Sequence, residues 1–325
     1  MLQIVKEIKE GRRLTREDSL EFLLQEELED LCKGADELRR YFKGRKANLC
    51  TIVNGKSGKC GENCKFCAQS AHNAAGAEVY DFLEPETILE DCMEQEKKGV
   101  DRYSVVTAGK GLSGQDFEKA LEAYRRIRQQ CHISLCASHG ILSDLQFQQL
   151  FESGVERYHC NLETSRKFFP EICTTHTYED KIRNIKRAKE VGMEICSGGI
   201  FGMGETWQDR IDMALELSEL GVVSIPLNIL MPIPGTPLEK QERLQDEDVL
   251  RIAAIFRFLN PEADIRMAGG RVLMKDAGRK VFLCGANAAI TGDMLTTTGN
   301  RTKEDRQMLR NLGYKTGGQE WKQET

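Results

Sequence analysis

Hydrophobic and polar positions along the chain follow two alternating patterns. Short runs rich in β-branched and aromatic residues are separated by longer segments in which apolar residues recur every three or four positions. The short runs predict strands at residues 48–53, 102–107, 133–138, 157–163, 194–200, 223–230, 264–269 and, from a weaker pattern, 288–292. The longer segments predict helices at residues 85–98, 114–130, 142–153, 177–191, 206–220 and 246–259.

The order of these elements predicts an α/β fold, a (β/α)8 TIM-type barrel with right-handed crossovers. An open doubly wound sheet has the same alternation, so periodicity leaves both architectures open. Residues 1–45 are strongly helical, and we expect an N-terminal extension that covers one end of the barrel. We assign residues 46–320 to the barrel and 321–325 to a tail, with fraying expected after Gly313.

Composition narrows the class of protein. A chain of 325 residues that is 40% hydrophobic can bury a large core. Its 46 basic and 51 acidic residues give no electrostatic case for a nucleic-acid or membrane partner. No apolar run reaches the roughly 20 residues that span a bilayer, and the N-terminus has no secretory pattern. Twelve cysteines without an export signal predict reduced thiols and metal ligands rather than disulfides, in a cytoplasmic protein.

Three cysteines within eight residues lie in a polar, glycine-rich loop after the first predicted strand. Cys60, Cys64 and Cys67 form the sequence CGENCKFC, and no fourth ligand stands nearby. Zinc sites usually close with a fourth Cys or His, whereas three thiolates on a four-iron cubane leave one iron open. The spacing resembles that of radical S-adenosylmethionine (SAM) enzymes, in which the open iron binds SAM. A zinc loop or a chance cluster is the alternative.

Further cysteines fall on three successive predicted strands. Cys136, Cys160 and Cys196 adjoin small or polar residues, which favours a second iron–sulfur cluster inside the barrel. The alternative is that they are buried small hydrophobes. Cys32, Cys92 and Cys131 fall in helical patterns, and we expect them to be structural or incidental. Cys50 on the first strand and Cys173 in a loop receive no assigned role.

From about residue 45 to 312 the chain resembles biotin synthases. The blocks that carry the resemblance, in order, are CGENCKFCAQS, YHCNLETS, ICTTHTY, CSGGIFGMGET, IPLNILMPIPGTPL, IRMAGGR and LCGAN. The resemblance implies a radical SAM sulfurtransferase with a 4Fe–4S cluster, which couples two SAM cleavages to sulfur insertion between C6 and C9 of dethiobiotin. The sulfur would come from an auxiliary iron–sulfur cluster deep in the barrel. Residues 226–319 would form the part associated with biotin and thiamin synthesis.

The same resemblance implies partners and residues for the cofactor. We expect dethiobiotin as substrate, an electron donor such as flavodoxin or ferredoxin, and a homodimer. Phe66 would pack near the SAM adenine, Glu163 would bind the ribose hydroxyls, and Lys181 would meet the SAM carboxylate. Glu163 could otherwise be an ordinary charge at a strand end. Close backbone approach to SAM is expected in the turn that contains Gly198, Gly199 and Glu205, although glycines there also suit a plain strand-to-helix turn.

For dethiobiotin, the resemblance implies two amides and a threonine loop. Asn161 and Asn228 would hydrogen-bond the ureido ring, since an amide donates and accepts at once. Each could instead be a buried asparagine satisfied by backbone. Thr296 and Thr297 would take the valerate carboxylate.

The auxiliary cluster departs from the family pattern. Cys136, Cys196 and Arg266 occupy three of its four usual ligand positions, but the fourth is Ser104, a harder and poorer iron ligand. We therefore expect a rebuilt cluster, a four-iron cluster with an extra sulfide rather than 2Fe–2S. Its third thiolate would be Cys160, although strand alternation turns Cys160 outward and favours His159 instead. Cys284 is the other candidate.

Two other functions stay open at this point. A related barrel enzyme of the hydrogenase-maturase or pyrrolysine-mutase type needs neither the asparagine pair nor the auxiliary thiolates on the strands. A non-catalytic iron–sulfur carrier needs no ribose-binding acid. Asn161, Asn228, Cys136 and Cys196 therefore favour the biotin synthase hypothesis.

Overall fold

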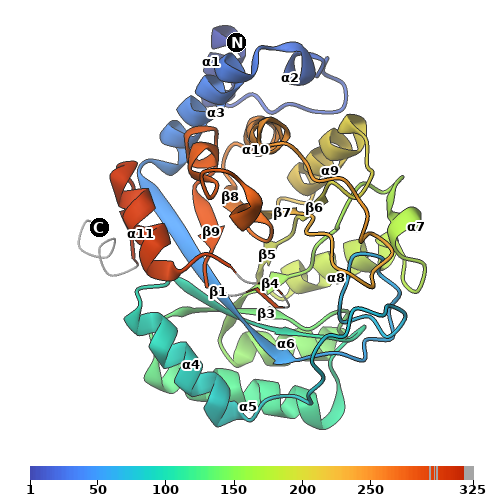
Figure 1. Ribbon diagram of the computed structural model, residues 1–325. Coiled ribbons are helices and arrows are strands. Elements are labelled where there is room, and N and C mark those ends of the chain that lie inside the picture. Colours follow the sequence, from blue (N-terminus) through green and yellow to red (C-terminus); the bar gives the residue numbers. More distant parts are fainter. Residues whose placement is uncertain (293, 296, 298, 318–325) are drawn as a thin grey trace.

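Parallel strands close into a barrel in the computed structural model, which describes residues 1–317 except 293, 296 and 298 (Figure 1). Within these residues, the eight barrel strands are β1 (Lys46–Lys56), β2 (Arg102–Thr107), β3 (Ser134–Ser138), β4 (Val155–His159), β5 (Glu194–Cys196), β7 (Ser224–Ile229), β8 (Asp264–Met267) and β9 (Ala288–Ile290). The pairing of β9 with β1, in which Asn48 faces Ala288, closes the sheet. This pairing excludes the open doubly wound alternative and confirms the barrel.

Two differences from the predicted strands bear on the position of the site. The strand at residues 157–163 stops at His159, so Asn161 and Glu163 lie just beyond the end of β4. The strand at residues 194–200 divides at residues 197–198 into β5 and β6 (Gly199–Phe201), and β6 pairs with β7. Both breaks occur at the carboxyl ends of strands, where barrel enzymes place functional side chains.

Helices cover the outside of the barrel between successive strands (Figure 1). They are α4 (Pro85–Lys97), α5 (Gly114–Gln130), α6 (Asp144–Glu152), α8 (Tyr178–Glu190), α9 (Trp207–Glu219) and α10 (Asp246–Leu259). Capping boxes start α6 at Ser143, α8 at Thr177 and α9 at Thr206, so the loops that precede these helices have defined ends. In the part of the chain that the structure describes, no helix is both long enough and apolar enough to cross a membrane.

Shorter elements appear that the hydrophobic pattern did not predict. They are α7 (Phe169–Ile172), the 3₁₀ turns η1 (Arg271–Leu273) and η2 (Arg279–Leu283), α11 (Thr302–Asn311) and β10 (Lys315–Thr316). Most of them are too short to show a helical or strand period.

The N-terminal extension consists of α1 (Leu2–Lys9), α2 (Phe22–Gln25) and α3 (Leu28–Lys43). It lies against α10 (Figure 1). Arg251 of α10 donates hydrogen bonds to the carbonyls of Leu23 and Glu26 in the extension, at 2.9 and 3.0 Å. Lys43 pairs with Asp264 at the start of β8, 2.9 Å away. The extension therefore contacts the amino-terminal side of the barrel, whereas the cysteine loop follows the carboxyl end of β1.

The segment after Gly313 is ordered rather than frayed. The Tyr314 hydroxyl donates to the carbonyls of Phe282 and Ala286, and β10 adds to β1 in parallel. The prediction of fraying is therefore wrong for residues 314–316, because a buried tyrosine and a strand pairing hold them. Residues 321–325 lie outside the described residues.

One disulfide corrects the expectation that all cysteines are thiols or metal ligands. Cys32 of α3 is bonded to Cys284, which follows η2. The bond joins the N-terminal extension to a segment 252 residues later in the chain. Because its sulfur is bonded to Cys32, Cys284 is not available as the third ligand of an auxiliary cluster.

Candidate active site

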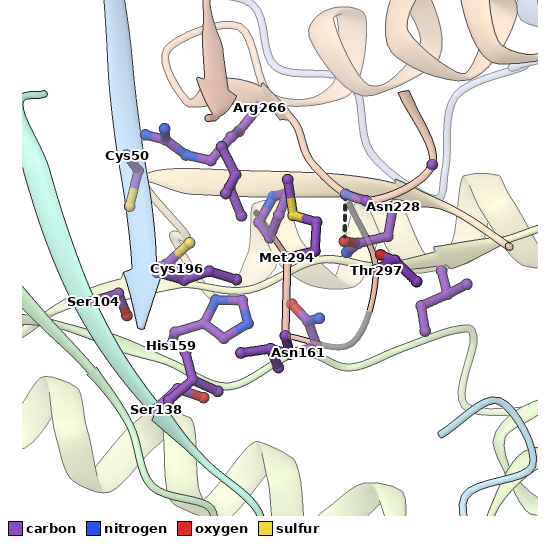
Figure 2. A pocket seen from close by; sticks show the side chains of 18 of the residues that line it. Cys50, Ser104, Ser138, His159, Asn161, Cys196, Asn228, Arg266, Met294 and Thr297 are labelled. Carbon is purple, nitrogen blue, oxygen red and sulfur yellow. Dashed lines mark hydrogen bonds between the residues drawn. The ribbon is translucent and has the colours of Figure 1, made fainter. Parts of the chain in front are cut away.

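A cavity of about 360 Å³ occupies the barrel interior and opens toward the carboxyl ends of the strands (Figure 2). It brings together many of the residues that the sequence singled out, namely Phe66, Cys67, Ser104, Cys136, His159, Asn161, Glu163, Cys196, Asn228, Arg266 and Thr297. Other expected residues do not line it, and these are Cys60, Cys64, Cys160, Lys181, Gly198, Gly199 and Glu205. Thr296 lies outside the described residues.

Buried thiols from three strands meet at the inner end of this cavity. Cys50 of β1, Cys136 of β3 and Cys196 of β5 all line the cavity, and the side chains of Cys50 and Cys136 are neighbours. Figure 2 shows Cys50, Cys196, Ser104 and Arg266 on one side of the cavity. Strand register explains the grouping, since Ser104 is the partner of Cys136 and neighbouring barrel strands point alternate residues inward.

Arginines surround these thiols. Arg266 lines the cavity, as do Arg102 and Arg157, while Asn48 and Ser224 hold the Arg266 guanidinium by accepting its hydrogen bonds. The neighbouring Cys50 thiol, together with these guanidinium charges, lowers the pKa of Cys136. Buried cations beside thiols favour an anionic occupant, and a thiolate-ligated iron–sulfur cluster is one.

Cys50, to which the sequence assigned no role, lines the cavity, whereas Cys160, expected there as a ligand, does not line it. Cys160 lies in the hydrophobic core, away from the cavity, where its thiol contacts Asn184 of α8. His159, one position earlier, lines the cavity, as strand alternation predicted. Cys50 has the same inward direction as Ile52, two residues later on β1, which also lines the cavity.

The cysteine loop is held in shape by backbone hydrogen bonds. Cys60 donates to Gln69 and accepts from Ala71, at 3.0 and 2.8 Å. The Asn73 amide donates to the carbonyls of Cys64 and Cys67, at 3.2 and 2.8 Å. Among the described residues, Cys60, Cys64 and Cys67 do not form the tight group that a single ion needs, with ligand atoms within 4.8 Å of one another. Three separated thiols on one loop suit a larger group such as a four-iron cluster.

A second loop packs directly on the cysteine loop. The Cys173 sulfur lies 3.7 Å from the Cys64 sulfur and 3.3 Å from Nδ1 of His176. The Glu62 carboxylate accepts a hydrogen bond from His176 Nδ1. It accepts a second hydrogen bond from the Thr175 hydroxyl, at 2.7 Å. Only the tertiary structure could reveal this contact, since more than 100 residues separate the two loops.

Glu163 lies between the cysteine loop and the asparagines in a strained conformation. Its φ is 71°, one of three positive φ values among the described non-glycine residues. Its amide donates to Gly198 and its carbonyl accepts from Ile200, at 3.1 and 2.9 Å, so backbone pairing on both sides maintains the strain. Lys181 lies 4.0 Å from its carboxylate. The carboxylate therefore reaches the cavity beside a buried cation.

Gly198, Gly199 and Glu205 make close contacts within the protein itself. A Cβ on Gly198 would lie 2.0 Å from the Pro226 carbonyl oxygen, and one on Gly199 would lie 2.3 Å from that of Glu163. Barrel backbones meet at both positions, which by itself requires glycine there. Glu205 accepts from the amides of Gly202 and Met203 and pairs with Arg210, so its carboxylate supports its own turn outside the cavity.

The two asparagines line the same part of the cavity, Asn161 just beyond β4 and Asn228 on β7 (Figure 2). The Asn161 amide accepts from the Gly198 N–H at 3.0 Å. The Asn228 amide donates to the Gly199 carbonyl at 3.1 Å and accepts from the Gly269 N–H at 3.0 Å. These contacts use part of each amide and fix its orientation, while the remaining donor and lone pair stay open to a ligand.

Comparison with known proteins defines the class first. The Radical SAM superfamily model matches residues 56–217, and the Biotin and Thiamin Synthesis associated domain model matches residues 226–315. This chain is therefore a radical SAM barrel enzyme.

Full-length relatives then define the family. The chain is 57% identical over 314 residues to biotin synthase from Clostridium beijerinckii, and the alignment covers 97% of this chain and 99% of the relative. It is 56% identical to biotin synthase from Alkaliphilus metalliredigens, in an alignment that covers 96% of this chain and 98% of the relative. The chain belongs to the biotin synthase family. The crystal structure of methylornithine synthase shares the fold, with a TM-score of 0.83 over 97% of this chain and 98% of that one, at 19% identity.

Proposed function

We propose that this enzyme converts dethiobiotin to biotin by sulfur insertion at C6 and C9. The observation that carries the proposal is one continuous cavity that has Phe66 and Cys67 of the cysteine loop in its wall at one end and Cys50, Cys136 and Cys196 at the other. A substrate between them lies within reach of both centres. Proximity of this kind is what a reaction between a cleaved cofactor and a second cluster requires.

The first centre is a 4Fe–4S cluster held by Cys60, Cys64 and Cys67, with SAM as its partner. When bound, this cluster supplies the electron that cleaves SAM. Phe66 supports the adenine, since it packs on Ile172, Met203 and Leu230 at the cavity wall. Glu163 binds the ribose hydroxyls and Lys181 balances its charge.

The second centre is an auxiliary iron–sulfur cluster held by Cys50, Cys136 and Cys196. Cys50 replaces Cys160 in this proposal because its thiol faces the cavity and contacts Cys136. Arg266 hydrogen-bonds or shields the cluster, and Ser104 is not an essential ligand. Three thiolates leave one iron of a four-iron cluster free to carry the sulfide that is donated.

Substrate contacts come from the middle of the cavity. Asn161 and Asn228 hydrogen-bond the ureido ring, because each retains a donor and an acceptor that backbone does not use. Thr297, which lines the cavity beside Met294, receives the valerate carboxylate. We also propose an electron donor such as flavodoxin or ferredoxin and a homodimeric assembly, both from the family resemblance.

The deciding experiment is anaerobic reconstitution followed by assay of biotin and 5′-deoxyadenosine from dethiobiotin, SAM and reductant. Both products should form. If 5′-deoxyadenosine forms without biotin, the substrate assignment is wrong.

Spectroscopy isolates the auxiliary cluster in a protein that lacks the three loop cysteines. Cys50→Ala should lose the cluster signal, while Cys160→Ala and Ser104→Ala should keep it. A signal that survives Cys50→Ala, or a 2Fe–2S spectrum that disappears in Ser104→Ala, contradicts this ligand set.

A further inference from the structure

Two thiols and an imidazole meet at the contact between the cysteine loop and the loop before α8. Among the described residues, Cys64, Cys173 and His176 form the one group of this kind whose ligand atoms all lie within 4.8 Å of one another. Cys173 is buried, and the side chain of His176 is 8% exposed. The sulfur insertion reaction uses neither Cys173 nor His176.

The spacing of the group suits a single tetrahedral ion. Metal–sulfur bonds of about 2.3 Å at tetrahedral angles place two thiolate sulfurs about 3.8 Å apart. The Cys64 and Cys173 sulfurs are 3.7 Å apart. Nε2 of His176 lies 3.9 Å from the Cys173 sulfur, close to the separation of about 3.6 Å expected for sulfur and nitrogen on one ion.

Glu62 provides an independent indication of a metal ligand. Its carboxylate accepts from His176 Nδ1, which fixes the tautomer and leaves Nε2 free to bind an ion. A carboxylate behind a histidine is the usual support of a metal-bound imidazole. Glu62 is itself held by the Thr175 hydroxyl at 2.7 Å, so the support is preorganised.

We propose that Cys64, Cys173 and His176 bind one soft divalent cation, Zn²⁺ or Fe²⁺, when the enzyme lacks its SAM-cleaving cluster. Two thiolates and a neutral imidazole balance the charge of the cation, and the fourth position stays open. The ion-binding site does not depend on the proposed function. Its competition with the cluster does, because Cys64 serves one site or the other.

Cobalt titration of the cluster-free, full-length protein tests the site, with a non-thiol reductant present. Co²⁺ replaces Zn²⁺ and gives visible bands when it is tetrahedral and bound by thiolates. Cys173→Ala should bind one equivalent less of tightly bound Co²⁺ than the parent. Glu62→Gln should keep that equivalent but bind it with about 10- to 100-fold lower affinity. Other thiols also bind Co²⁺, so each variant is read as a difference from the parent.

Two controls make the result decisive. Cys160→Ala removes a buried thiol outside the group and should keep the full stoichiometry, as should Cys67→Ala, which removes a cluster ligand but none of this site. If Cys173→Ala keeps the equivalent, or Cys67→Ala loses it, the proposed ligand set is wrong. Circular dichroism of Cys173→Ala, and formation of the auxiliary cluster in a separately reconstituted sample, show that the variant is folded.

Competition with the cluster is a separate measurement. Zn²⁺ added before reconstitution should lower the iron bound by the cysteine loop in the parent and spare it in Cys173→Ala. Equal inhibition of both proteins would show that Zn²⁺ acts elsewhere. Failure of biotin formation with a normal cobalt result would count against the proposed function alone.

Discussion

Asn228 joins three parts of the barrel wall, and its removal should affect stability and substrate binding separately. Its amide donates to the Gly199 carbonyl of β6 at 3.1 Å and accepts from the Gly269 N–H after β8 at 3.0 Å. Asn228→Ala leaves both backbone groups without these partners. The side chain also faces the cavity, where we propose that it binds the ureido ring.

The expected magnitude follows from the burial of those groups. An unpaired buried polar group costs about 1–3 kcal/mol, and Gly199 is buried while Gly269 is partly exposed. We therefore expect the free energy of unfolding to fall by roughly 2–4 kcal/mol. Loss of a ureido hydrogen bond should weaken dethiobiotin binding by about 1–3 kcal/mol, or about 5- to 150-fold.

Urea unfolding measures the first effect, and anaerobic equilibrium binding of SAM and of dethiobiotin measures the second. Asn311→Ala removes an exposed asparagine of α11 and should change neither. SAM affinity should change little in Asn228→Ala. An equal loss of SAM and dethiobiotin affinity would show a folding role only, and unchanged stability would refute the hydrogen bonds.

Three further predictions concern the cluster, the disulfide and a buried acid. Cys67→Ala should abolish reductive SAM cleavage, measured as 5′-deoxyadenosine, because each loop cysteine supplies one thiolate. Cys284→Ser, which removes the bond to Cys32, should lower the free energy of unfolding by about 2–5 kcal/mol without reductant and by much less with it. Burial raises the pKa of Asp101 to about 6, despite a hydrogen bond from the Leu49 amide, so the folded state favours the neutral acid. Stability should therefore fall as the pH rises from about 4 to 6, by about 3 kcal/mol relative to Asp101→Asn, and parallel urea-unfolding profiles for the two proteins would contradict this.

The sequence by itself determined the order of strands and helices and the cysteine loop. Hydrophobic periodicity is a local property, so helices such as α5 were predicted at their observed bounds. Family blocks likewise pointed to Asn161, Asn228 and Arg266, which the structure brings to one cavity. Strand ends were predicted less well, since residues beyond His159 continue an apolar pattern while the backbone turns away at Glu163.

Only the tertiary structure decided which cysteines meet. Cys50 and Cys136 lie on strands separated by β2, and closure of the barrel turns both toward its interior. Cys173 meets Cys64 across 109 residues. Contacts of this kind depend on the direction of side chains on different strands and loops, which no local pattern specifies, whereas the pattern within each element depends on neighbours along the chain.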